Sequence, residues 1–146
     1  MPPIFILLVL FLDQLSKFLA TKKLILNKSL PILKGIFHLT LVHNRGAAFG
    51  ILKDQIPLFI FISLFAVALA VFKLNKSRYK KFSIYNVSLS LILAGALGNL
   101  IDRLFLGYVV DFLDFRIWPV FNIADSAITI GAILLGWSIL KVKSQK

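Results

Sequence analysis

The chain has 146 residues, of which 59% are hydrophobic and 16% are charged, and its formal net charge is +11. A soluble domain usually carries about 25% charged residues, so the apolar surplus predicts a protein whose surface faces lipid. The chain has no cysteine, which excludes disulfides, a thiolate nucleophile and a cysteine-ligated zinc site. In so apolar a chain, the positive charge indicates contact with membrane lipid headgroups and not with nucleic acid.

Four long apolar stretches cover residues 3–20, 56–72, 84–101 and 121–140. Each is close to the roughly 20 residues that a helix needs to cross the hydrocarbon of a bilayer. The first stretch has no basic region before it and no small-residue cleavage site after it, so we expect it to be retained. The fold class predicted is an all-α membrane protein with four transmembrane helices in a single domain, residues 1–146.

A different pattern lies between the first two stretches. Residues 35–43 alternate and are rich in β-branched and aromatic side chains, which predicts one or two strands. The glycines and small residues of 44–50 allow close backbone approach. We expect a small β-element on the outer face, able to offer edge hydrogen bonds to an extended peptide.

The loops predict an orientation in the membrane. Five positive charges fall within residues 73–81, and the segment 141–146 adds three lysines without any acid. By the positive-inside rule, both termini and the middle loop are expected to be cytoplasmic. All the aspartates then lie toward the outer face, which places the chemistry there.

All six acidic residues are aspartate, and four of them fall within residues 102–125, between strongly apolar segments. A charged side chain in the middle of a membrane helix costs about 2.5–3.5 kcal/mol, so such a cluster indicates a function. Two neighbouring carboxylates can share one proton and activate water. The pattern therefore predicts an intramembrane aspartyl enzyme. No metal or cofactor is expected, because His38 and His43 should point to opposite faces of a strand.

The spacing leaves two candidate pairs, Asp111 with Asp125 or Asp102 with Asp125. Asp125 also fits a structural role in the first turn of a helix capped by Asn122.

Other polar residues fit structural roles. Asn99, Asp102 and Arg103 share one helical face, where Arg103 or another cation would neutralise Asp102. Asp13 and Lys17 are spaced for an intrahelical ion pair. Ala94 and Gly98 form a small-xxx-small pair that lets another helix approach closely.

Five blocks in order, residues 13–17, 44–49, 95–103, 109–112 and 121–125, together resemble the lipoprotein signal peptidase family, also called signal peptidase II. The resemblance spans nearly the whole chain. Two features depart from the family pattern: Ala94 stands where a glycine is usual, and few residues precede the first span.

The resemblance implies a four-span bacterial membrane aspartyl protease. Its substrates would be prolipoproteins whose signal peptide is removed just before a cysteine that carries a diacylglyceryl group. Asp111 and Asp125 would be the catalytic dyad, and no cofactor is implied. A monomer is expected, with membrane lipids as its surroundings. Substrate-binding or supporting roles are implied for Asp13, Lys17, Asn44, Gly46, Asn99, Asp102, Arg103 and Asn122.

Two other classes of function fit the sequence less well. A magnesium-dependent phosphatidyl-alcohol transferase would need an Asp-x-x-Asp-Gly-x-x-Ala-Arg stretch, which the chain lacks. A proton-relay carrier using Asp102 and Asp125 would need acids at midspan or on both sides of the membrane, whereas the cluster is one-sided.

Overall fold

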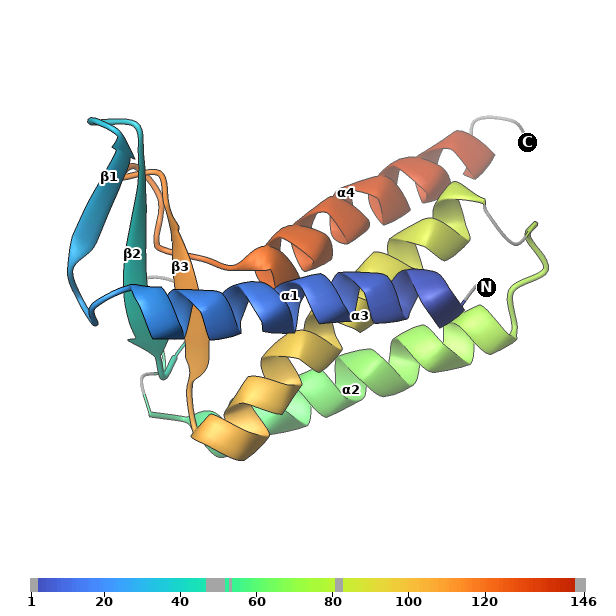
Figure 1. The fold of residues 1–146 in the computed structure, drawn as a ribbon. Helices are drawn as coiled ribbons and strands as arrows, with labels where there is room; N and C mark the ends of the chain where they lie inside the picture. The colour runs from blue at the N-terminus through green and yellow to red at the C-terminus, as the bar shows by residue number, and fades with distance from the viewer. Residues whose placement is uncertain (1–2, 47–51, 53, 81–82, 144–146) are drawn as a thin grey trace.

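The computed structural model describes residues 3–46, 52, 54–80 and 83–143. Its four long helices lie side by side, with a small sheet at one end of the bundle (Figure 1). Each is long and apolar enough to cross a membrane, which confirms the predicted all-α membrane fold with four spans. The helices are α1 (Pro3–Lys23), α2 (Ile56–Asn75), α3 (Ile84–Leu106) and α4 (Ile123–Lys143).

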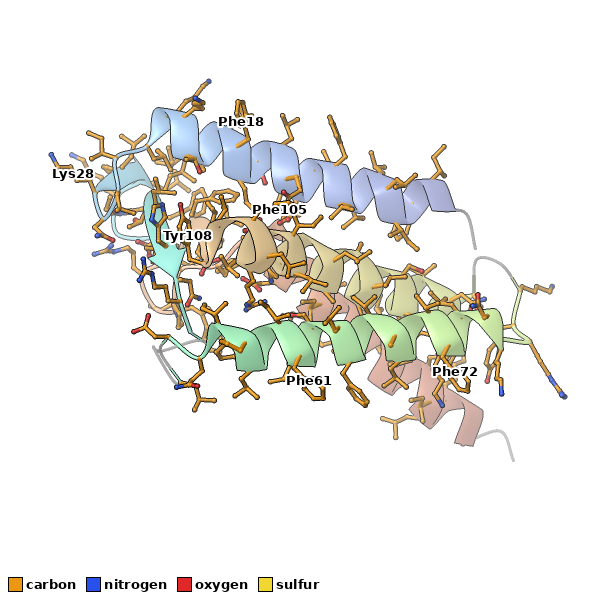
Figure 2. All side chains as sticks on the ribbon, turned by 90° about the horizontal axis from the view of Figure 1, so that it is seen from below. Phe18, Lys28, Phe61, Phe72, Phe105 and Tyr108 are labelled. Carbon is orange, nitrogen blue, oxygen red and sulfur yellow. The ribbon has the colours of Figure 1, made fainter. Side chains whose placement is uncertain are left out.

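α3 is the central helix of the bundle. In its most apolar window 61% of residues are buried, against 11–17% in the other three helices. The outer helices instead turn large apolar side chains outward, as Phe61 and Phe72 of α2 do (Figure 2). With so little buried surface, α1, α2 and α4 expose the apolar faces that a lipid environment requires.

Glycines let α3 and α4 approach closely. A Cβ atom on Gly95 would lie 2.4 Å from the carbonyl oxygen of Ala124, and one on Gly131 would lie 2.8 Å from that of Ser88. Neither position can therefore hold a side chain at this helix spacing. The backbone contact at Ala124 fixes α4 at the residue before Asp125.

Both members of the small pair predicted on α3 are buried. Ala94 is fully buried, and a Cβ on Gly98 would lie 2.5 Å from Oδ2 of Asp13 on α1. The absent side chain of Gly98 thus makes room for a carboxylate on a neighbouring helix.

The sheet has three antiparallel strands in the order β1 (Ser29–Leu33), β2 (Phe37–Asn44) and β3 (Val109–Asp114). The predicted β-element between the first two helices is confirmed as β1 and β2. Residues 109–114, for which no strand was predicted, form a third strand that pairs with β2, with Asp111 opposite Val42. Residues 47–49, in the second of the family blocks, lie outside the described residues.

A small apolar core joins the sheet to α1. Ala20, Leu41, Val110 and Phe112 are buried together there. The start of α1, the end of α4 and the facing ends of α2 and α3 lie at the opposite end of the bundle (Figure 1). This topology fits the predicted sidedness; the cellular side of each end stays a prediction.

Gly95→Ala should destabilise the bundle, because the new methyl group would overlap the Ala124 carbonyl oxygen. Overpacking of this kind costs about 1–3 kcal/mol, so the melting temperature in detergent should fall by several degrees. Gly136→Ala on α4 is the matched control, since a Cβ atom added there would have no neighbour within 4 Å. That control should be neutral or slightly stabilising. Equal melting temperatures for the two variants would show that the α3–α4 contact is not this tight.

Candidate active site

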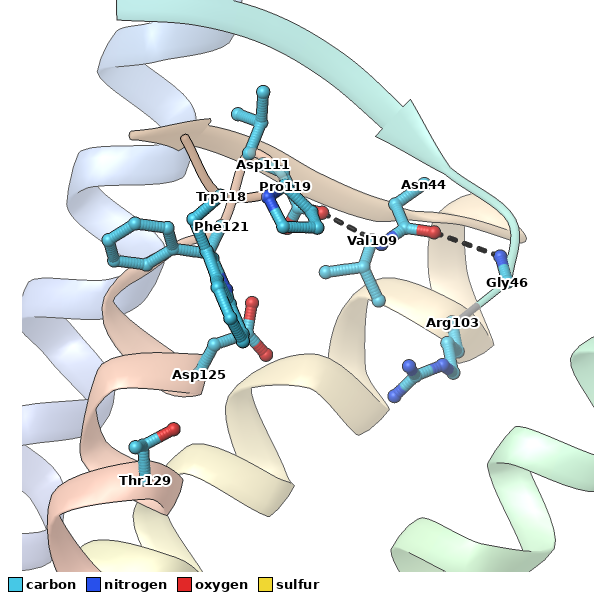
Figure 3. Close-up of a pocket in the computed structure, with 11 residues that line it drawn as sticks. Asn44, Gly46, Arg103, Val109, Asp111, Trp118, Pro119, Phe121, Asp125 and Thr129 are labelled. Carbon is cyan, nitrogen blue, oxygen red and sulfur yellow. Dashed lines mark hydrogen bonds between the residues drawn. The ribbon is translucent and has the colours of Figure 1, made fainter. Parts of the chain in front are cut away.

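A cavity of about 250 Å³ lies between the end of α3, β3 and the start of α4. Asp111 from β3, Asp125 from α4 and Arg103 from α3 reach it from three different elements (Figure 3). The remaining lining residues are Asn44, Gly46, Val109, Trp118, Pro119, Val120, Phe121 and Thr129. The cavity is thus polar on the β3 side and aromatic along the segment that leads into α4.

Asp111 is held by two side-chain amides. Its Oδ2 accepts a hydrogen bond of 2.8 Å from Asn44 on β2, and its Oδ1 accepts one of 2.7 Å from Asn122. The residue is 1% exposed. Burial raises the pKa of the Asp111 carboxyl to about 7, and the neighbouring charge of Asp125 acts in the same direction. Near neutral pH, Asp111 can therefore either hold or release a proton.

Asp125 lies in the first turn of α4 and exchanges two hydrogen bonds with Asn122, which precedes the helix. Asn122 Oδ1 accepts from the backbone N–H of Asp125 at 2.8 Å, and Asp125 Oδ2 accepts from that of Asn122 at 3.3 Å. This reciprocal capping confirms the predicted role of Asn122. Asn99 of α3 donates a third bond to Asp125 Oδ1 at 2.7 Å. These three hydrogen bonds fix the position of the Asp125 side chain, which lines the cavity.

Behind the cavity, one lysine joins two helices. The Nζ of Lys17 lies 2.9 Å from Oδ2 of Asp13, which confirms the predicted i, i+4 ion pair. The same Nζ lies 3.0 Å from Oδ2 of Asp102 and donates to Asn99 Oδ1 at 3.0 Å. All four side chains are buried. The cation that meets Asp102 is therefore Lys17 and not the adjacent Arg103.

The two carboxylates also hold the backbone beside the cavity aspartates. Asp13 Oδ1 accepts from the backbone N–H of Ala124 at 2.8 Å, and Asp102 Oδ2 accepts from that of Val110 at 3.0 Å. Ala124 and Val110 directly precede Asp125 and Asp111. Asp102 is thus engaged behind the cavity wall, while Asp111 and Asp125 line the cavity itself.

Arg103 reaches the cavity from the last turns of α3. Its guanidinium lies 5.2 Å from the ring centre of Phe59 and donates to Ser63 Oγ at 3.3 Å. Both partners belong to α2. The contacts aim a positive charge into the cavity that holds the two carboxylates.

Sequence reasoning missed several residues of this region. Gln14 donates to the Gly98 carbonyl at 3.2 Å and to Asp102 Oδ1 at 3.1 Å, and its place inside the block 13–17 was an available signal. Trp118 and Thr129 of the cavity wall carry no such signal, because their contribution depends on how the β3–α4 connection folds. Within the described ranges, no group of three His, Cys, Asp or Glu residues is placed to hold a metal ion.

The family model described as Signal peptidase (SPase) II matches residues 5–141. The lipoprotein signal peptidase of Halothermothrix orenii is 52% identical over 132 residues, which cover 90% of each chain. That of Clostridioides difficile is 44% identical over 96% of this chain and 95% of its own. The chain belongs to the signal peptidase II family, a family of membrane-spanning peptidases.

Two solved structures of bacterial membrane enzymes, both determined by the in meso method, have the same fold. One superposes with a TM-score of 0.90 at 35% identity, covering 98% of this chain and 89% of that one. The other gives a TM-score of 0.84, also at 35% identity, over 94% and 91% of the two chains.

Lys17→Met should strongly destabilise the protein. It removes the cation that balances the buried Asp13 and Asp102 while keeping a side chain of similar length. Breaking a buried ion pair from one side costs about 3–5 kcal/mol, so a large fall in melting temperature in detergent is expected. Lys22→Met, at an exposed position on the same helix, should change it little. A stable Lys17→Met variant would mean that the two carboxylates are already neutral.

Relative to the wild-type protein, Asp111→Asn should gain thermal stability as the pH rises from 5 to 7. The folded-state pKa of Asp111, about 7, lies above its ordinary value, so the folded state keeps a proton that the unfolded state releases. Stability from this group is therefore lost as the pH rises through 7, whereas an amide does not ionise. Melting curves in detergent at several pH values measure the effect. Asp54→Asn, whose side chain is 61% exposed, should show no pH-dependent gain, and a gain independent of pH for Asp111→Asn would contradict the prediction.

Proposed function

We propose that this protein is an aspartyl endopeptidase that removes the signal peptide of diacylglyceryl-modified prolipoproteins by cutting just before the lipidated cysteine. Its relatives are named lipoprotein signal peptidases, which supports this class of substrate. Asp111 and Asp125 are the proposed catalytic dyad. The active site would lie at the outer face of the cytoplasmic membrane.

The observation that carries the proposal is that Asp111 and Asp125 line one cavity and contact neutral amide donors. An amide holds a carboxylate in place without fixing its protonation state as strongly as a paired cation would. Two carboxyl groups in a largely buried site cannot both ionise cheaply, so the pair would share one proton and titrate as a unit.

The reaction follows from that shared proton. The ionised carboxylate takes a proton from a water molecule. The oxygen of that water attacks the carbonyl carbon of the residue before the lipidated cysteine. The protonated carboxyl gives its proton to the carbonyl oxygen. When the carbon–nitrogen bond breaks, the departing amine receives a proton from the dyad and a hydroxyl of the tetrahedral intermediate returns one to it, so the dyad ends with one proton as it began. No covalent enzyme intermediate forms.

Arg103 and Asn44 are proposed to bind the substrate backbone at the cavity. Both line it, and Arg103 is held there by Phe59 and Ser63. A guanidinium can donate to the peptide carbonyl groups that flank the scissile bond. Asp102 is not expected to contact the substrate, because its oxygens bind Lys17, Gln14 and the backbone behind the cavity. Asp102 is a positioning residue in this scheme.

Asp111→Asn and Asp125→Asn should each abolish cleavage of a diacylglyceryl-modified prolipoprotein by the purified protein, a loss of at least about a thousandfold. The amide keeps the shape but cannot exchange the shared proton. Mass spectrometry of the products measures the rate and locates the cut bond. Asp54→Asn, an exposed aspartate near the start of α2, is the matched control and should retain full activity.

The same assay separates this proposal from its alternatives. The unlipidated precursor should be cleaved far more slowly than the lipidated one, and a chelator should leave the rate unchanged. Wild-type-like turnover by either asparagine variant would remove that residue from the dyad. Loss of activity in chelator, restored by a divalent ion, would indicate metal-assisted hydrolysis instead.

A further inference from the structure

A second, larger cavity of about 460 Å³ adjoins the candidate active site. It shares Trp118, Phe121, Asp125 and Thr129 with the first cavity, so Asp125 lies in the wall of both spaces. The lining that belongs to the second cavity alone is mostly apolar and includes Ile117 and Ile130. An apolar space that begins at a proposed catalytic carboxylate calls for an apolar part of the substrate close to the scissile bond.

The β3–α4 segment that forms one wall is held in place by the sheet. Asp114 accepts from the backbone N–H of Arg116 at 2.8 Å, from its guanidinium at 3.0 Å and from Thr40 Oγ1 on β2 at 2.6 Å. The backbones of Leu113 and Phe121 exchange hydrogen bonds of 2.8 and 3.0 Å, which closes the base of the segment. The cavity is therefore built before any ligand arrives.

Aromatic rings extend this wall toward the sheet. The rings of Phe115 and Phe121 are stacked, with centroids 5.9 Å apart and ring planes at 12° to each other. The ring centroid of Phe115 lies 4.9 Å from that of Phe37 on β2. Phe115 and Phe121 both line the second cavity. The stacked rings therefore form an apolar part of the wall of the second cavity.

The opposite wall is α4, whose exposed face continues beyond the cavity. Ser126, Thr129 and Ile130 line the cavity at positions i, i+3 and i+4. Ile130, Ile133 and Trp137 then form one exposed stripe along the helix, 52%, 64% and 65% exposed. Because α4 is a membrane-spanning helix, that stripe faces lipid. A hydrocarbon chain can thus enter the cavity from the bilayer without crossing water.

We propose that this cavity holds one acyl chain of the diacylglyceryl group on the substrate cysteine. The inference rests on the proposed function, in which the lipidated cysteine directly follows the scissile bond. An acyl chain fits better than a signal-peptide side chain, because the cavity is continuous with the lipid-facing stripe of α4. Seating the chain beside Asp125 fixes the depth and position of the scissile carbonyl, so the site selects lipidated substrate by positioning.

Substrates with short acyl chains, which stay monomeric in water, test whether the cavity binds an acyl chain. Each methylene buried from water should raise kcat/KM about fourfold until the cavity is full. Ile130→Trp should fill the cavity and flatten this dependence on chain length. Ile133→Trp, on the same stripe outside the cavity lining, is the matched control and should keep the wild-type dependence. Should Ile130→Trp fold poorly, Ile117→Ser removes the opposite wall at a 92% exposed position and should weaken the dependence as well.

Photo-crosslinking separates this inference from the proposed function. A prolipoprotein with a diazirine on one acyl chain, bound to Asp111→Asn so that it is not cleaved, should label Ile117 or Ile130 and spare Ile133. If wild-type protein cleaves lipidated substrate but the label falls along the whole stripe, the acyl chain lies along α4 without a defined site in the cavity and the inference fails. A diazirine on the signal peptide that labels Ile117 or Ile130 would assign the cavity to the peptide instead. If the label falls as expected but the wild-type protein does not cleave the lipidated substrate, the acyl site stands and the peptidase proposal is overturned.

Discussion

The Lys17 ammonium is the interaction on which the rest of the site depends. It contacts Asp13 and Asp102 at 2.9 and 3.0 Å in a buried environment, so carboxylates from two helices share one cation. Isolated, either carboxylate would cost several kcal/mol of desolvation. Once paired, each also accepts a backbone hydrogen bond, from Ala124 and from Val110. The ion cluster of α1 and α3 therefore sets where β3 and α4 begin, and with them the two aspartates of the cavity.

Close helix packing follows from the same cluster. Asp13 can reach Lys17 and the start of α4 only because Gly98 offers no side chain, since a Cβ there would lie 2.5 Å from Asp13 Oδ2. One turn away, Gly95 allows the Ala124 carbonyl to approach α3. Small residues on α3 thus serve polar contacts as well as helix packing, on the same helix that buries Asn99 and Asp102 in so apolar a chain.

Sequence reasoning reached what short-range spacing encodes. The four spans, the Asp13–Lys17 pair and the Asn122–Asp125 cap depend on residues at most a few turns apart, and all three were predicted correctly. The contact between Lys17 and Asp102 joins residues far apart in the chain, so helical spacing alone pointed to Arg103. β3 was missed because aspartates at positions 111 and 114 interrupt its apolar pattern. Pairing with β2 overrides that pattern, since Asn44 and Thr40 supply hydrogen-bond partners for both carboxylates.

The buried lysine and the amides occupy different layers around the proposed dyad. The ammonium of Lys17 lies behind the cavity wall, where it pairs with the carboxylates that bind the backbone. Asn44, Asn99 and Asn122 instead contact the two carboxylates of the dyad directly. A lysine in direct contact would favour full ionisation and prevent the pair from keeping a proton. Neutral amides fix the geometry and leave the proton exchangeable, and burial brings the Asp111 pKa to about 7. Rigid position and variable charge are the two properties that acid–base hydrolysis needs from one pair of side chains. Because the charge of Lys17 is kept apart from the titrating pair, one small bundle provides both the rigid position and the variable charge.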